Sequence, residues 1–146
     1  PWEIMDLKYG MGSSIGLAAG LARTGIGQKV IALSGDSAFL HSGLGELIGA
    51  ARANAPLLLV LLANDITALS GGQPHPATGY DARGRQRKSV DLAALVRASG
   101  VGDVHVVDPE DRETTEAAFE AGITAGRLTA VIVERACPRW RESPAP

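Results

Sequence analysis

Two polar residues of the chain stand where chemistry could be done, each directly after an apolar run. Asp36 comes shortly after the β-rich run 29–33, and Asn64 follows the wholly apolar run 57–63. Because parallel strands end at one edge of a sheet, Asp36 and Asn64 can meet there if their strands are neighbours. A carboxylate and an amide oxygen are hard ligands of the kind that Mg²⁺ prefers. The pattern therefore predicts a magnesium site at the ends of two buried strands.

The turn around Asp36 also suits an anion. We expect a helix to open after Gly35-Asp36-Ser37, and the first N–H groups of a helix have no partner within it. The alternatives are that Asp36 only caps this helix and that Asn64 is only a polar residue at a strand end. Because both residues occur together, we favour one pocket that holds a metal ion and a diphosphate.

The rest of the chain alternates predicted helices and strands, which is typical of a parallel α/β sheet. We expect helices near 12–24, 42–54, 90–99 and 110–125, and strands near 29–34, 57–63, 103–108 and 128–134. Ser89 is expected to cap the third helix, and Pro109, Glu110 and Asp111 to form the first turn of the fourth. The predicted fold class is α/β, with an open, mainly parallel sheet flanked by helices.

A long segment, 65–88, leaves directly from Asn64. It is too long and too rich in Gly, Pro and Arg for an ordinary connection, so we expect it to take part in the site. His75 lies between two prolines that stiffen the backbone, and it could contact substrate or cofactor. His41, at the start of the helix after the Asp36 turn, is a second candidate.

Composition limits the class of protein. With 146 residues, of which 45% are hydrophobic, the chain is expected to form one domain over residues 1–146. A formal charge of −2 argues against general nucleic-acid binding, and no stretch is long and apolar enough for a membrane span. Cys137 is the one cysteine, which fits a reducing cytoplasm and leaves no iron–sulfur ligand set. Since the chain begins with Pro1 close to a Gly-rich segment, we expect a fragment or module of something longer.

Three sequence blocks, in the same order along the chain, resemble those of thiamine diphosphate enzymes. Within that superfamily they are most similar to the large subunit of indolepyruvate ferredoxin oxidoreductases. The diphosphate-binding domain of these enzymes carries Gly-Asp-Gly followed, one helix and one strand later, by Asn. The matching residues are Gly35, Asp36 and Asn64, with Ser37 in place of the last glycine. The other blocks are Met-Gly-Ser-Ser-Ile-Gly at 11–16 and Gly-Gln-Pro-His-Pro at 72–76. The resemblance covers nearly the whole chain and implies the thiamine diphosphate-binding fold of the diphosphate-binding type.

The resemblance also implies a set of site residues. Mg²⁺ would be bound by Asp36, Asn64 and the backbone carbonyl of Ile66. Thiamine diphosphate would contact Met11, Gly35, Asp36, Ser37, Ala38, His41, Asn64, Ile66, Thr67 and Ala68. Met11 would be the apolar wedge that keeps the cofactor bent, a plain core methionine being the alternative. Met11 and His75 are therefore the candidate catalytic residues.

The activity implied is the oxidative decarboxylation of an aryl 2-oxoacid, such as indolepyruvate, to an acyl-CoA. This chain would be half of the active site of an oligomeric enzyme, and a pyrimidine-binding domain or subunit would supply the activating glutamate. Iron–sulfur clusters, coenzyme A and ferredoxin as electron acceptor would be bound outside this chain. The basic residues Arg83, Arg85, Arg87 and Lys88 could contact coenzyme A or an acidic electron carrier, although a solvated loop is the favoured interpretation.

Two other functions stay open. A non-oxidative thiamine diphosphate-dependent 2-oxoacid decarboxylase would use the same site and release an aldehyde. A non-catalytic interaction domain would keep the fold without turnover.

Overall fold

The computed structural model describes residues 5–138. Within them, four parallel strands form one open sheet in the order β1-β2-β4-β3. The strands are β1 (Val30–Gly35), β2 (Leu57–Ala63), β3 (Asp103–Val107) and β4 (Thr129–Glu134). The α-helices are α1 (Ser14–Ala22), α2 (Asp36–Ala38), α3 (Leu44–Arg52), α4 (Leu92–Ala98) and α5 (Arg112–Thr124). The predicted α/β fold with a parallel sheet is confirmed, and every predicted strand and helix is present.

Strand β2 is central because its side chains are apolar on both faces. Six of its seven residues are buried, as expected for a strand covered on both sides. Strand β1 pairs with it in parallel, with Gly35 opposite Leu62. Both strands therefore end at the same edge of the sheet, which brings the residues after β1 beside those after β2. The prediction that these two strands are neighbours is confirmed.

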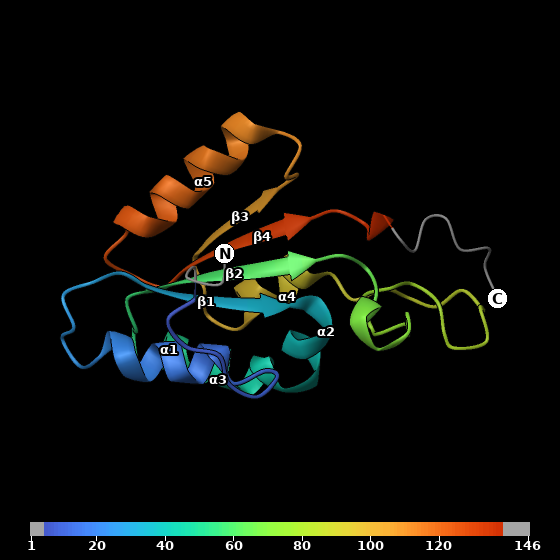
Figure 1. Ribbon diagram of the computed structural model, residues 1–146, viewed down its shortest axis with the longest axis horizontal. Coiled ribbons are helices and arrows are strands. Elements are labelled where there is room, and N and C mark those ends of the chain that lie inside the picture. Colours follow the sequence, from blue (N-terminus) through green and yellow to red (C-terminus); the bar gives the residue numbers. More distant parts are fainter. Residues whose placement is uncertain (1–4, 139–146) are drawn as a thin grey trace.

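Helices cover the two faces of the sheet unequally (Figure 1). Helices α1, α3 and α4 pack on one face, around a core that includes Ile15, Leu47 and Val96. Helix α5 packs on the other face, where Ala118 lies in a smaller core with Leu58. No helix in the part of the chain that the structure describes is long and apolar enough to cross a membrane.

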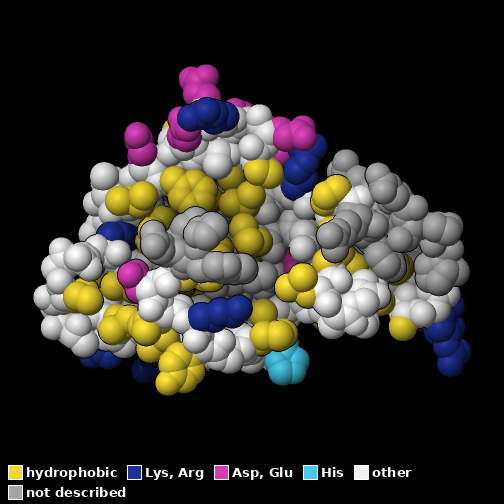
Figure 2. Space-filling model, viewed as in Figure 1, with side chains coloured by type: hydrophobic (Ala, Val, Ile, Leu, Met, Phe, Trp, Pro, Cys, Tyr) yellow, Lys and Arg dark blue, Asp and Glu magenta, His cyan; other side chains and the backbone are white. Residues whose placement is uncertain are grey.

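The face under α5 is covered over only part of its width. Helix α5 lies against β3 and β4, whereas Ile31, Leu33 and Leu62 on the other two strands are 50%, 46% and 41% exposed. Figure 2 shows hydrophobic side chains gathered over the middle of the molecule, below the charged outer side of α5. This half of the sheet face is therefore apolar, and no helix among residues 5–138 covers it.

The helix after β1 opens at the Asp36 turn, as expected for an anion site, and the predicted bounds of 42–54 begin too late. The chain is helical from Asp36 to Arg52, with a π-helix, η1 (Phe39–Gly43), between α2 and α3. A π-helical turn inserts an extra residue, and such turns are frequent at functional sites. A Cβ at Gly43 would lie 3.2 Å from Cδ2 of Phe39 and 3.3 Å from Cδ1 of Ile15, so glycine allows α1 to pack closely here.

The predicted caps of two later helices were misplaced. Asp91, not Ser89, caps α4, and its Oδ1 accepts a hydrogen bond from the N–H of Ala94 at 2.8 Å. The Ser89 hydroxyl instead donates to the carbonyl of Ala77. Asp111 is the N-cap of α5 rather than part of its first turn, because its carboxylate accepts from Thr114. In both cases an aspartate outcompetes its neighbours as the acceptor for the free N–H groups.

The segment between β2 and α4 lies beyond the arrowheads of the strands in Figure 1. It contains the 3₁₀-helix η2 (Ala68–Ser70), and Gln73 closes this turn by hydrogen bonds to Ser70. Further along, Asp81 forms ion pairs with Arg85 and Arg87. Two members of the predicted basic cluster are therefore engaged within the loop, which agrees with the interpretation of a solvated loop.

Candidate functional site

Asp36 directly follows β1, at the edge of the sheet where the carboxyl ends of the strands lie. Its side chain is buried, with 2% of the residue exposed. Oδ1 accepts a hydrogen bond from the N–H of Ser37 at 2.7 Å. Oδ2 accepts from the N–H groups of Asn64 at 2.8 Å and Asp65 at 3.0 Å. The carboxylate therefore ties the end of β1 to the end of β2, and the structure brings Asp36 and Asn64 together as the sequence predicted.

The surroundings of Asp36 favour its charged form. Burial alone would raise the pKa of this carboxyl, but nearby His75 and the N–H groups of Ser37 and Asn64 hold the pKa below its ordinary value. A buried carboxylate that stays ionised is what a divalent cation requires of its ligand.

Asn64 is held in a tight turn at the end of β2. Its Oδ1 accepts a hydrogen bond from the N–H of Ile66 at 3.2 Å, and its backbone carbonyl accepts from Cys137 at 3.0 Å. Asp65 has a φ of 65°, in the left-handed region, which turns the chain sharply after Asn64. The Ile66 side chain is buried at 1% exposure, so only its backbone can serve the site.

Ser37 and Thr67 join the two loops. Their hydroxyl oxygens are 2.8 Å apart. Ala38 lies one residue further along the helix, and Ala68 begins η2 directly after Thr67. These four predicted cofactor-binding residues therefore line the turn after β1 and the loop after β2.

Met11 lies in a turn that packs on the π-helix. Its side chain is 79% exposed, and its backbone carbonyl accepts a long hydrogen bond of 3.4 Å from the Ser42 hydroxyl. The next residue, Gly12, is buried with a φ of +86°. His41, beside Ser42 on the same helical segment, is exposed. The alternative that Met11 is a plain core residue is wrong, because an exposed side chain is not part of the core.

His75 reaches the site from the long loop, but it faces Asp36 rather than open space. Its side chain is 5% exposed, and Nε2 lies 3.3 Å from Oδ2 of Asp36. The two atoms are close enough to interact, but their geometry is not that of a good hydrogen bond. The sequence identified His75 through its flanking prolines, but no signal in it indicated which residue the ring would meet.

Comparison with known families decides what kind of domain this is. A family model described as "Thiamine pyrophosphate enzyme, C-terminal TPP binding domain" matches residues 6–133. The chain belongs to this family. Membership implies thiamine diphosphate as the cofactor.

Two relatives carry a more specific description than the family model does. The chain is 36% identical over 137 residues to the indolepyruvate oxidoreductase subunit IorA of Archaeoglobus fulgidus, covering 94% of this chain and 22% of the relative. It is 35% identical over 154 residues to the same subunit of Pyrococcus abyssi, covering 97% and 24%. The chain thus spans about a quarter of the length of these relatives.

Solved structures share the fold. The 2-oxoglutarate:ferredoxin oxidoreductase of Magnetococcus marinus is similar with a TM-score of 0.76 at 18% identity, covering 88% of this chain and 46% of that chain. A thiamine diphosphate-dependent 4-hydroxybenzoylformate decarboxylase from Rhodococcus jostii RHA1 has a TM-score of 0.64 at 23% identity, covering 86% and 23%. These likenesses show the arrangement of the thiamine diphosphate-binding domain and nothing finer.

The residues of this thiamine diphosphate-binding domain fit the cofactor and the Mg²⁺ ion that the sequence analysis predicted. Among the described residues, no group of three His, Cys, Asp or Glu side chains could hold a metal, so a site built from carboxylates, imidazoles or thiolates alone is not present there. The Asp36 edge offers a carboxylate, an amide oxygen and backbone carbonyls, which is the hard donor set of Mg²⁺. A Cβ at Gly35 would point into open space, so the turn before Asp36 can be approached closely by a ligand.

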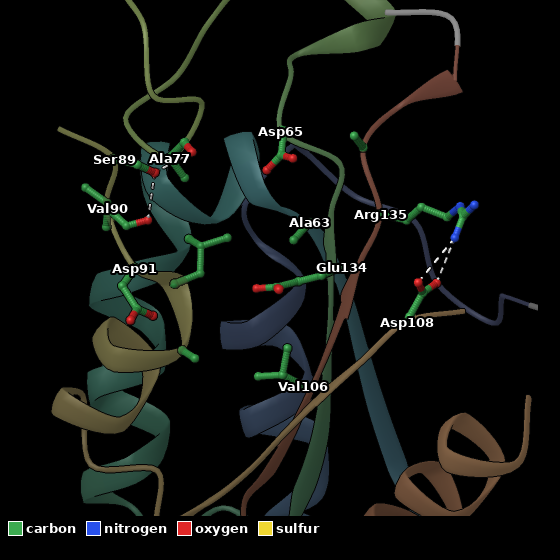
Figure 3. A pocket seen from close by; sticks show the side chains of 13 residues that line it. Ala63, Asp65, Ala77, Ser89, Val90, Asp91, Val106, Asp108, Glu134 and Arg135 are labelled. Carbon is green, nitrogen blue, oxygen red and sulfur yellow. Dashed lines mark hydrogen bonds and ion pairs between the residues drawn. The ribbon is translucent and has the colours of Figure 1, made fainter. Parts of the chain in front are cut away.

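A pocket of about 620 Å³ is lined by residues at the ends of β2 and β4, including Ala63 and Glu134 (Figure 3). Carboxylates of Asp65, Asp91 and Glu134 line it, and its one basic residue, Arg135, is paired with Asp108. So acidic a lining repels a diphosphate. The Asp36 turn is therefore the better place for the anion in this domain.

We expect Glu134→Gln to stabilise the domain slightly at neutral pH. Burial and the carboxylates of Asp65 and Asp91 raise the pKa of Glu134. Its contribution to stability is therefore fully present below the ordinary glutamate pKa and is lost as the pH rises through the raised value. Because the side chain is only partly buried, the gain from the substitution should be about 0.5 kcal/mol or less. Thermal unfolding at acid and neutral pH measures it, and an equal difference between the two proteins at both pH values would contradict this account.

Proposed function

We propose that this chain is the thiamine diphosphate- and Mg²⁺-binding half of the active site of a 2-oxoacid:ferredoxin oxidoreductase, acting on an aryl 2-oxoacid such as indolepyruvate. The observation that carries the proposal is the buried, ionised Asp36 held against Asn64 at the strand ends. The aryl substrate rests on the likeness to indolepyruvate oxidoreductase subunits.

In this proposal the domain holds its cofactor by two loops. Asp36, Asn64 and the carbonyl of Ile66 bind Mg²⁺, and the start of the helical segment after Gly35 receives the diphosphate. The N–H groups at a helix start favour such an anion. The remaining predicted contacts are Met11, Ser37, Ala38, His41, Thr67 and Ala68.

When bound, thiamine diphosphate supplies the carbon nucleophile that adds to the 2-oxoacid and takes up the electron pair left by CO₂. The chain's own part is to hold and orient it. Asp36 balances the charge of the metal ion, and the Ser37–Thr67 contact fixes the distance between the two loops. Met11 presents an exposed apolar side chain from a turn anchored on the π-helix.

The rest of the enzyme lies outside this chain. The matched relatives are about four times longer, which leaves room for further domains. We propose that a pyrimidine-binding domain or subunit supplies the activating glutamate, and that iron–sulfur clusters, coenzyme A and ferredoxin bind elsewhere in an oligomeric, cytoplasmic assembly. On its own, residues 1–146 would be one cofactor-binding module without turnover.

Anaerobic assay of the complete enzyme tests the proposal. The enzyme is supplied with indolepyruvate, thiamine diphosphate, Mg²⁺ and coenzyme A, and viologen reduction and aldehyde release are followed together. Dye reduction that depends on coenzyme A supports the oxidoreductase. Aldehyde without dye reduction would assign the non-oxidative decarboxylase instead. No product, with no cofactor bound, would point to an interaction domain.

Met11→Ala should leave folding and cofactor affinity largely intact while slowing turnover. Because the side chain is 79% exposed, its truncation should change the free energy of unfolding by about 0.5 kcal/mol or less. If Met11 holds the cofactor bent, the exchange of the cofactor's reactive C2 proton with deuterium should slow. An unchanged exchange rate would remove Met11 from the mechanism.

A further inference from the structure

We infer that His75 is a positioning residue for Asp36, and that it reserves Oδ1 of Asp36 for the metal ion by engaging Oδ2. The inference deepens the proposed function and rests on it where Mg²⁺ is concerned. It assigns to His75 a role through Asp36, in place of the direct contact with substrate or cofactor that the sequence suggested.

The tautomer of His75 follows from its backbone contacts. Nδ1 accepts a hydrogen bond from the N–H of Ala77 at 3.2 Å, so Nδ1 carries no proton. The ring proton is therefore on Nε2, the atom 3.3 Å from Oδ2 of Asp36. Among the described residues Nε2 is buried and has no other partner, so Oδ2 of Asp36 is the acceptor that its proton faces.

The same contacts exclude His75 as a metal ligand. A ligating Nε2 needs its lone pair, which would move the proton to Nδ1. Nδ1 would then point a proton at the N–H of Ala77. Both groups would be donors, and a hydrogen bond in the interior would be lost. His75 thus acts as a donor to a ligand and not as a ligand itself.

The two carboxylate oxygens of Asp36 differ in how many lone-pair positions are still free. The N–H groups of Asn64 and Asp65 occupy the lone-pair positions of Oδ2, and Nε2 of His75 faces the same oxygen as a further donor. Oδ1 accepts only from Ser37 among the contacts of the described residues. A carboxylate has about four lone-pair positions, so Oδ1 is the oxygen with one left for Mg²⁺. Donors on the other oxygen hold the carboxylate in place when the cation binds.

His75 also connects the long loop to the ends of β1 and β2, where the proposed metal site lies. Its own N–H donates to the Thr78 hydroxyl at 2.9 Å, and its carbonyl accepts from the N–H of Thr78 at the same distance. The ring is therefore fixed by a tight turn before it meets Asp36. Loss of the ring should loosen both the turn and the carboxylate.

Two amide substitutions distinguish the effect of losing the N–H donor from the effect of losing side-chain volume. In His75→Gln an amide N–H can reach the position of Nε2, whereas in His75→Asn the side chain is too short. Mg²⁺ affinity is measured by calorimetric titration of the complete enzyme at saturating thiamine diphosphate. We expect His75→Asn to weaken Mg²⁺ binding by roughly 10- to 100-fold, and His75→Gln to restore most of it. The matched control is His105→Asn, since His105 also faces an aspartate, Asp103, at 3.0 Å but lies on β3.

Equal Mg²⁺ affinity in the wild type and both variants, or equal loss in both variants, would overturn the inference. Loss of Mg²⁺ affinity in the His105 control as large as in His75→Asn would overturn it as well. Nitrogen NMR of the metal-free protein gives a second readout that needs no cofactor. It should show His75 with its proton on Nε2 and a signal that shifts on Asp36→Asn. A proton on Nδ1 would overturn the inference. A wild type without Mg²⁺-dependent cofactor binding but with the expected NMR signal would overturn the proposed function and the metal-ion part of the inference, and would support only the role of His75 as a donor to Asp36.

Discussion

Asp36→Asn is expected to abolish Mg²⁺-dependent binding of thiamine diphosphate. The substitution keeps the shape of the side chain but removes the one negative charge that Asp36 brings to the metal edge. A neutral amide also offers one oxygen where the carboxylate offers two, and that oxygen is needed by the N–H groups of Asn64 and Asp65. No acceptor is then left for the cation. We expect Mg²⁺ affinity to fall roughly a hundredfold or more.

The stability cost of Asp36→Asn should be smaller than its effect on binding. The amide nitrogen would face the N–H of Ser37, so one hydrogen bond is lost, at about 1 to 3 kcal/mol. Calorimetric titration of the complete enzyme measures binding, and circular dichroism verifies the fold. Asp111→Asn is the matched control, because it alters a helix-capping aspartate away from the site and should leave binding unchanged. Wild-type affinity in a folded Asp36→Asn enzyme would refute the assignment of the metal site.

Asn64→Ala should weaken binding less than Asp36→Asn does. It removes a proposed ligand that carries no charge, and the backbone of residue 64 can still donate to Asp36. An effect as large as that of Asp36→Asn would mean that Asn64 contributes more to the site than one amide oxygen.

The sequence predicted the part of the site that depends on strand ends. Apolar runs locate β1 and β2, and the polar residues after them must fall at one edge of a parallel sheet. The contact between Asp36 and Asn64 follows from this rule without knowledge of side-chain geometry. For the same reason the boundaries of β2 were predicted to the residue, since its apolar run is sharply bounded.

The sequence could not predict the features that depend on contacts between distant segments. The π-helix contains Ser42, against which Gly12 packs, and no local pattern marks such an insertion. His75 was identified as a candidate, but its orientation depends on the turn that Ala77 and Thr78 form around it. The misplaced caps have a simpler origin, because Ser89 and Asp91 are both good caps and only the three-dimensional course of the chain selects one.

Gly12→Ala is expected to destabilise the domain by roughly 2 to 4 kcal/mol, because it adds backbone strain to a steric clash. The φ of Gly12 is +86°, which an alanine adopts only with strain. An added Cβ would lie 1.7 Å from Oγ of Ser42 and 2.9 Å from its Cβ. The turn that carries Met11 must therefore move away from the π-helix. Chemical denaturation measures the loss, and a free energy of unfolding equal to that of the wild type would contradict the packing described for this turn.

Two further variants separate the causes of this loss. The double variant Gly12→Ala/Ser42→Gly removes the clashing atoms but keeps the backbone strain at position 12. Gly12→Ala should therefore cost less stability in the Ser42→Gly background than in the wild type, but the cost should not vanish. Gly20→Ala, in α1, is the matched control, since a Cβ there meets nothing within 4 Å. Alanine is the better residue within a helix, so this control should gain about 0.5 to 1 kcal/mol. Opposite signs for the same substitution at positions 12 and 20 would show that the fit against Ser42, and not glycine content, holds the Met11 turn beside the helix that follows Asp36.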